Sequence, residues 1–203
     1  MRGSWRLVNR TELYNVAEDP EQRNNIAAEH RDVVEEFREG YERWWEKVST
    51  RFEEEIPISI GSVKEKVTCI NSHDWRGAGG DCAWNQGQIR EAKICNSYVE
   101  ILVEHSGVYS FELRRWPKEA DLAITEGIPG QIKDWFTGGK AIPVETATLR
   151  IGDYEETKPV TDDDFSIQFQ AELPAGPTHL QSYLRDAEDI VRGSYYVYVS
   201  RIG

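Results

Sequence analysis

The residues best suited to chemistry lie in two short tryptophan-containing segments, Asp74-Trp75-Arg76 and Trp84-Asn85-Gln86. Sugars present flat C–H faces that pack on aromatic rings, and hydroxyl groups that pair with carboxylates, amides and guanidinium groups. This combination indicates a carbohydrate-binding site, to which Trp135 is a further candidate contributor. The alternative is that these indole rings close the end of a β-sandwich or face another domain, because tryptophan is often buried in such folds.

Two adjacent arginines, Arg114 and Arg115, offer a different kind of site. Guanidinium groups bind anions through charge-assisted hydrogen bonds, so these residues could hold a sulfate group. The alternative is that they form salt bridges, since the chain contains 36 acidic residues.

Catalysis and metal binding find less support in the sequence. His73 and Asp74 do not form a dyad by themselves, because neighbouring residues of a strand point to opposite faces. Cys69, Cys82 and Cys95 lack the paired spacing of a zinc site, and either one disulfide or three reduced thiols fits their odd number. Asp162-Asp163-Asp164 could contribute to a calcium site, but its spacing favours a solvated acidic turn. We therefore expect no catalytic residue and no metal site.

Composition restricts the classes of partner. The chain has 203 residues, a net charge of −12, seven tryptophans and nine tyrosines. Such aromatic content is typical of a packed globular protein. A binding surface for nucleic acid is not expected, because phosphate contacts need a basic face. No apolar run approaches the length of a membrane span, and the first residues lack the apolar core of a signal peptide.

Residues 1–55 are predicted to form a small subdomain with one hairpin and one long helix. Residues 5–8 and 12–16 read as strands around Asn9-Arg10, and Asp19-Pro20-Glu21-Gln22 reads as a capped helical start. Residues 30–52 have apolar and aromatic side chains mostly at i+3, i+4 and i+7 spacing, which predicts an amphipathic helix. So small a unit cannot bury this stripe alone. We expect the helix to dock on another domain or to mediate self-association.

Residues 56–203 are predicted to form an antiparallel β-sandwich. A charge run ending at Pro57 marks the boundary, and short alternating strands with glycine and proline turns follow it. Residues 97–104 and 108–116 read as a hairpin around His105-Ser106-Gly107. The whole chain is thus predicted to be mainly β with one long helix.

Residues 12–27 resemble a segment near the end of the catalytic domain in the sulfatase family, the formylglycine-dependent sulfuric ester hydrolases. The matching residues are Leu13, Tyr14, Asp19, Pro20, Glu21, Asn25 and Ala27, whereas Asn15 stands where the family more often has Asp. Residues 68–75, 84–86, 107–117 and 175–181 resemble phrases of a C-terminal extension of some bacterial sulfatases, which looks like a carbohydrate-binding jelly roll.

The resemblance implies a C-terminal fragment of an arylsulfatase-like hydrolase that shapes substrate recognition or stabilises the parent enzyme. Its implied partners are a missing catalytic domain, where calcium is expected, and a sulfated glycan. The family nucleophile is Cys or Ser in Cys/Ser-x-Pro-x-Arg, and neither residue stands two positions before any of the eight prolines. The isolated chain is therefore expected to be non-catalytic and to bind no cofactor. A periplasmic or secreted parent is one alternative for its location, and a stand-alone carbohydrate-binding module is the alternative function.

Overall fold

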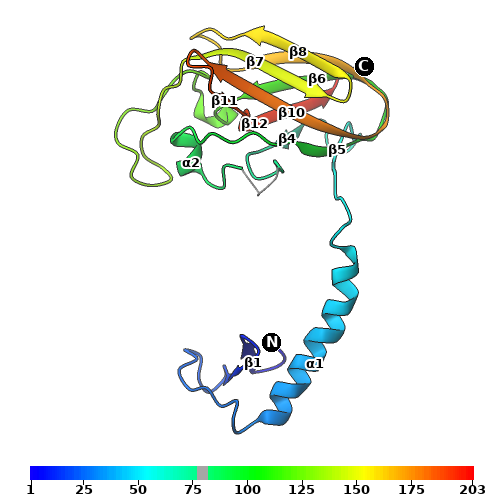
Figure 1. The fold of residues 1–203 in the computed structure, drawn as a ribbon, viewed down its shortest axis with the longest axis vertical. Helices are drawn as coiled ribbons and strands as arrows, with labels where there is room; N and C mark the ends of the chain where they lie inside the picture. Colours follow the sequence, from blue (N-terminus) through cyan, green and yellow to red (C-terminus); the bar gives the residue numbers. More distant parts are fainter. Residues whose placement is uncertain (77–81) are drawn as a thin grey trace. The chain divides into compact units, whose positions relative to one another are not determined.

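The computed structural model describes residues 1–76 and 82–203, which divide into two compact units, Met1–Glu55 and Ile56–Gly203. Figure 1 traces the first unit in blue and cyan and the second from cyan through green to red. The first unit holds one hairpin and the long helix, and the second holds a β-sandwich. The predicted fold class is confirmed.

The hairpin of the first unit pairs strands β1 (Trp5–Val8) and β2 (Glu12–Asn15). Residues 9–11 connect the two strands. Asn9 and Arg10 both adopt positive φ, and the Thr11 N–H donates to the Val8 carbonyl at 3.1 Å, which closes a tight turn. Helix α1 (Arg31–Val48) follows, and a single 3₁₀ turn, η1 (Ser49–Arg51), extends it. The helix therefore ends four residues earlier than predicted, and Phe52 lies beyond it.

Residues 19–22 form a turn without the predicted helical start. The Asp19 carboxylate accepts a hydrogen bond from the Asn24 N–H, and Gln22 has a positive φ that a helix cannot continue. Asn25 Oδ1 accepts from the N–H groups of Leu13 and Ala27, each at 3.0 Å. Side-chain acceptors thus satisfy the backbone locally, in competition with helix formation.

Two packed sheets form the second unit (Figure 1). The larger has the order β3-β5-β10-β7-β8, with β11 paired to β10, and the smaller has the order β4-β12-β6-β9. The strands of the larger sheet are β3 (Ile58–Ile60), β5 (Val99–Val103), β7 (Val144–Ile151), β8 (Tyr154–Pro159), β10 (Gly176–Asp186) and β11 (Val191–Arg192). Those of the smaller sheet are β4 (Thr68–Ile70), β6 (Gly107–Arg114), β9 (Ile167–Leu173) and β12 (Tyr196–Arg201). Pairing is antiparallel except between β3 and β5.

Alternating side chains of the two sheets form one core. Ile101 and Leu149 of the larger sheet and Phe111, Phe169 and Val197 of the smaller one are all fully buried in it. Short helices α2 (Gln86–Arg90) and η2 (Lys118–Ala120) lie in the connecting loops. A second apolar cluster, which includes Ile89 of α2, Trp116 and Tyr195, anchors these loops.

The predicted hairpin of residues 97–104 and 108–116 is wrong. Its two segments become β5 and β6, which belong to different sheets, so the chain crosses from one sheet to the other at His105-Ser106-Gly107. The Tyr109 hydroxyl donates to the His105 carbonyl at 2.6 Å and fixes this corner. Alternation reveals that a segment is a strand, but it carries no information about which strand is its neighbour.

Candidate functional site

A polar pocket of about 140 Å³ lies where the loop after β4 approaches β5. This volume holds about five water molecules, and it is smaller than a site that encloses a drug-sized ligand. The residues that line the pocket are Ile56, Ile58, His73, Asp74, Arg76, Val99 and Glu100. It therefore combines two carboxylates, one guanidinium group and an imidazole with apolar walls.

Local hydrogen bonds explain how the loop presents its side chains. Asp74 Oδ2 accepts from the Asn71 N–H at 2.8 Å, and the Asp74 N–H donates to the Asn71 carbonyl at 3.0 Å. Two backbone bonds with Tyr98, at 2.6 and 2.8 Å, then hold Arg76 beside the start of β5. Asp74 and Arg76 thus reach the pocket from a closed turn whose backbone is tied to the larger sheet.

Glu100 is the buried polar group of the pocket. It is 7% exposed, and its neighbours Val99 and Ile101 point into the sandwich core, so Glu100 lies on the opposite face of β5. Among the described residues, no hydrogen-bond donor reaches Glu100 Oε2. Arg76 Nη1 lies 3.5 Å from this oxygen and forms an ion pair with it. A buried carboxylate oxygen without a donor is unfavourable, so it favours a ligand that supplies one.

An exposed aromatic ring flanks the pocket. The rings of His73 and Trp84 lie 5.4 Å apart, and His73 Nε2 contacts the Trp84 carbonyl oxygen. Trp84 is 59% exposed. Its indole therefore offers a free face beside a polar pocket, which is the arrangement that a sugar ring needs.

Next to Glu100, His179 of β10 and Tyr98 before β5 form a second aromatic pair, which does not line the pocket. His179 lies directly opposite Glu100 in the β5–β10 register, and its ring is 4.8 Å from that of Tyr98. Sequence reasoning missed Glu100, Tyr98 and His179. One signal was present for Glu100, since it is a lone charged residue within an otherwise apolar strand. The positions of Tyr98 and His179 depend on pairing between distant strands.

The other candidate residues of the two tryptophan segments have structural contacts. Trp75 is 7% exposed and belongs to the main core, so a sugar cannot stack on it unless the sandwich opens. Asn85 caps α2 by accepting from the Gln88 N–H at 3.0 Å, and Gln86 Nε2 donates to the Tyr196 hydroxyl at 2.5 Å. Of Trp75, Trp84, Asn85 and Gln86, Trp84 is the residue that is both exposed and in contact with a residue of the pocket, His73.

Neither Arg114 nor Arg115 lines the pocket with Arg76. Arg114 is buried and pairs with Glu112 at 2.8 Å. Arg115 is fully buried and donates to the carbonyls of Glu126 and Lys140, and its guanidinium lies over the Trp116 ring. Burial lowers the pKa of Arg115 to about 10, so the group remains charged at neutral pH. Its donors hold the loop in place. The salt-bridge alternative therefore fits Arg114, which pairs with Glu112, whereas Arg115 donates to backbone carbonyls.

A second exposed aromatic pair, Trp135 and Phe136, lies in the loop beside α2, 58% and 78% exposed. Arg90 donates to the Trp135 carbonyl at 3.0 Å and the Gly138 carbonyl at 2.6 Å. The Asp134 carboxylate accepts from the Phe136 and Thr137 N–H groups. These rings are held in place, but neither lines the polar pocket.

Within residues 1–76 and 82–203, no three His, Cys, Asp or Glu side chains gather in a group that could bind a metal. Asp164 of the acidic run accepts from both the N–H and the hydroxyl of Thr161, each at 2.7 Å. No disulfide joins Cys69, Cys82 and Cys95 within this part of the chain. None of the helices in this part of the chain is long and apolar enough to cross a membrane.

No family model matches the sequence, and no curated protein matches it. Among solved structures, the chain is similar to a ruminal GH26 endo-beta-1,4-mannanase, with a TM-score of 0.37 and 13% identity over 67% of this chain. That match spans 26% of the mannanase chain. It is also similar to the CBM35 from Cellvibrio japonicus Abf62, with a TM-score of 0.31 and 16% identity, over 67% of this chain and 81% of that one. Neither of these two proteins is described as a sulfatase.

Proposed function

We propose that the β-sandwich of residues 56–203 binds carbohydrate at the pocket of His73, Asp74, Arg76 and Glu100, with the sugar stacked against Trp84. The observation that carries the proposal is Glu100 Oε2, which is buried in a pocket flanked by an exposed indole and accepts no hydrogen bond from the described residues, with only the ion pair to Arg76 beside it. A sugar hydroxyl donates to this oxygen, and Arg76 donates to a neighbouring hydroxyl. The function is recognition rather than catalysis.

The charge of the pocket favours neutral or aminated sugars over sulfated ones. Asp74 and Glu100 supply two negative charges against one positive charge from Arg76, and the whole chain carries −12. A sulfate group would meet repulsion that only Arg76 offsets. Any sulfate preference was expected to need Arg76, Arg114 or Arg115, but the latter two donate to groups of the protein itself.

The test is calorimetric titration with a panel of neutral β-1,4-linked manno-, gluco- and xylo-oligosaccharides, a glucosamine oligomer and a sulfated oligosaccharide. We expect binding to a neutral or aminated member. Glu100→Gln should weaken it at least about tenfold, because a hydrogen bond to a charged group is lost. Trp84→Ala should weaken it about fivefold to tenfold through loss of stacking.

Trp135→Ala is the matched control, since Trp135 and Trp84 are almost equally exposed. Binding that survives Trp84→Ala but is lost in Trp135→Ala would place the site beside α2 instead. Preference for the sulfated sugar, or no binding to any member, would contradict the proposal.

A second candidate function is the accessory C-terminal region of a sulfatase. One observation favours it: within residues 1–55, Leu13 and Val34 are the only buried apolar side chains, so this unit needs a larger partner. Reading the coding sequence upstream of Met1 tests it. A Cys/Ser-x-Pro-x-Arg motif in the same open reading frame would support this candidate, and its absence would exclude it. An aryl sulfate should show no turnover with the isolated chain.

A further inference from the structure

The C-terminal half of α1 and the residue after η1 carry a continuous aromatic face, formed by Tyr41, Trp44, Trp45 and Phe52. These residues are 40%, 53%, 38% and 62% exposed. Their rings touch in sequence, with centroids 5.6 Å apart for Tyr41–Trp44, 6.2 Å for Trp44–Trp45 and 5.1 Å for Trp45–Phe52. At 150–250 Å² for each full ring, about 400 Å² of aromatic surface is exposed. Patches of this size mark interaction sites.

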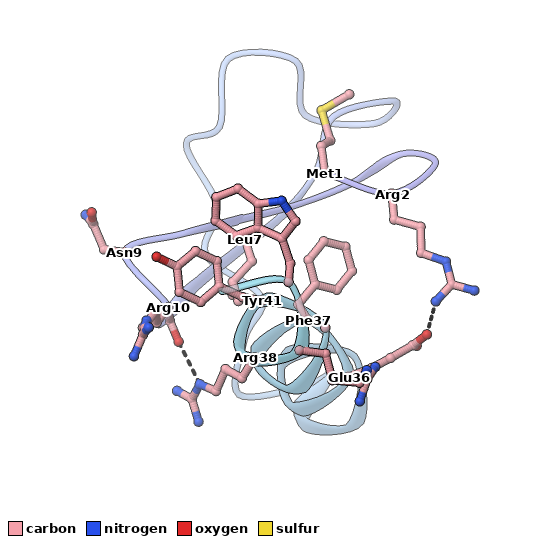
Figure 2. A pocket seen from close by; sticks show the side chains of 12 residues that line it. Met1, Arg2, Leu7, Asn9, Arg10, Glu36, Phe37, Arg38 and Tyr41 are labelled. Carbon is pink, nitrogen blue, oxygen red and sulfur yellow. Dashed lines mark hydrogen bonds and ion pairs between the residues drawn. The ribbon is translucent and has the colours of Figure 1, made fainter. Parts of the chain in front are cut away.

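A groove of about 850 Å³ lies next to this face, between the hairpin and α1 (Figure 2). Its apolar lining includes Leu7, Phe37, Tyr41 and Trp44. The charged groups on its rim are already paired within the unit: Arg2 with Glu36, Arg10 with Glu42, Arg38 with Glu35 and Arg43 with Glu39. The groove therefore suits an apolar or aromatic side chain better than an anion.

The spacing along α1 is that of a helix that packs on another helix. Val34, Phe37, Tyr41, Trp44 and Val48 stand at alternating intervals of three and four residues, as in a coiled-coil seam. Val34 is buried within the unit, whereas Tyr41 and Trp44 are exposed. The exposed part of the seam is thus its C-terminal half, which is open to a partner helix.

The charge distribution indicates which partner fits. Residues 31–42 contain five acidic and two basic side chains, whereas residues 43–51 contain one acidic and three basic ones. Two copies of α1 that run antiparallel place the acidic half of each against the basic half of the other. Two parallel copies would place like charges together.

We propose that two copies of this chain associate through an antiparallel pair of α1 helices, with the two-fold axis between Trp44 and Trp45. This register places Phe52 of each copy opposite Phe37, at the apolar groove of the other. It also places Glu42, which already pairs with Arg10 of its own copy, opposite Lys47 of the second copy. The contact is self-complementary, as a two-fold interface requires. The two aromatic faces bring about 800 Å² into it, which is below the roughly 1,000 Å² of a stable specific interface, so we expect a weak dimer that forms at high concentration.

Analytical ultracentrifugation of the full chain over a concentration series tests the proposal. We expect a species of twice the 23.3 kDa chain mass at high concentration. Trp44→Glu should raise the dissociation constant at least tenfold. Glu42→Lys should raise it about fivefold, because it sets two lysines opposite each other in both symmetric positions. Adding Lys47→Glu to Glu42→Lys should restore most of the affinity, since the pair is then reversed.

Glu188→Lys is the control for net charge, because Glu188 is an exposed residue of the second unit. It should leave the dissociation constant unchanged, and circular dichroism should show that every variant keeps its helix. A chain that stays monomeric at all concentrations would refute the proposal. If adding Lys47→Glu did not restore the affinity that Glu42→Lys loses, the antiparallel register would be refuted.

Discussion

Two tryptophans that the sequence does not distinguish should respond in opposite ways to substitution. Trp75 and Trp84 both lie in loop segments, but Trp75 is 7% exposed and Trp84 is 59% exposed. We expect Trp75→Ala to cost stability with little specific effect on sugar binding. We expect Trp84→Ala to weaken binding and leave stability almost unchanged.

The magnitudes follow from burial. Replacing a buried Trp by Ala costs about 3–5 kcal/mol, because transfer free energy is lost and a cavity remains. A domain of this size has a total stability of about 5–15 kcal/mol, and each kcal/mol shifts the melting temperature by about 2–4 °C. Trp75→Ala should therefore lower the melting temperature by roughly 6–20 °C. An exposed substitution such as Trp84→Ala should change stability by about 0.5 kcal/mol.

A third variant isolates the indole N–H of Trp75, which has no hydrogen-bond partner among the described residues. Trp75→Phe keeps most of the ring and deletes the unsatisfied donor, so it should cost less than Trp75→Ala. Differential scanning calorimetry measures the three melting temperatures, and titration with the sugar that binds measures affinity. The reasoning would be refuted if Trp84→Ala destabilised the fold as much as Trp75→Ala did, or if Trp75→Phe were the most harmful.

Three further predictions concern the sandwich. Arg115→Met should destabilise it by about 2–4 kcal/mol in urea denaturation, because two loop carbonyls lose their donor; an unchanged midpoint would contradict this. Burial pushes the pKa of Asp186 up, but the Ile190 N–H and the Arg192 guanidinium, 3.0 Å away, outweigh it and hold the pKa below its usual value. The stability that this pair contributes should thus be complete above about pH 4 and be lost as pH falls through the folded-state pKa. In Asp186→Asn, the urea midpoint of unfolding should therefore fall less steeply at acid pH than it does in the wild type. Gly61→Ala should lower the melting temperature, since Gly61 has φ +80° and a Cβ there would lie 2.0 Å from the Tyr109 hydroxyl; equal melting temperatures would count against that contact.

Much of the local structure follows from the sequence alone. The hairpin at Asn9-Arg10, the amphipathic helix and the alternating strands are set by interactions between residues close in the chain. Period-two patterns also identified the inward face of the strands, such as Tyr109, Phe111 and Leu113 of β6, because burial on one face requires alternation. The sequence likewise predicted that the aromatic stripe of α1 is not covered within its own unit, because a short hairpin is too small to cover it.

The sequence predicted only part of the candidate site, because the site depends on which strands become neighbours. Asp74, Arg76 and Trp84 have suitable chemistry in the sequence, but their relation to Glu100 arises when the loop after β4 meets β5. His179 reaches this place because β10 pairs with β5, and no local pattern encodes that pairing. The same holds for burial: Trp75 became core and Trp84 became surface because of strand order and loop path. Contacts between distant residues are decided by the packing of whole sheets, and this is why the tertiary structure alone could assemble the pocket.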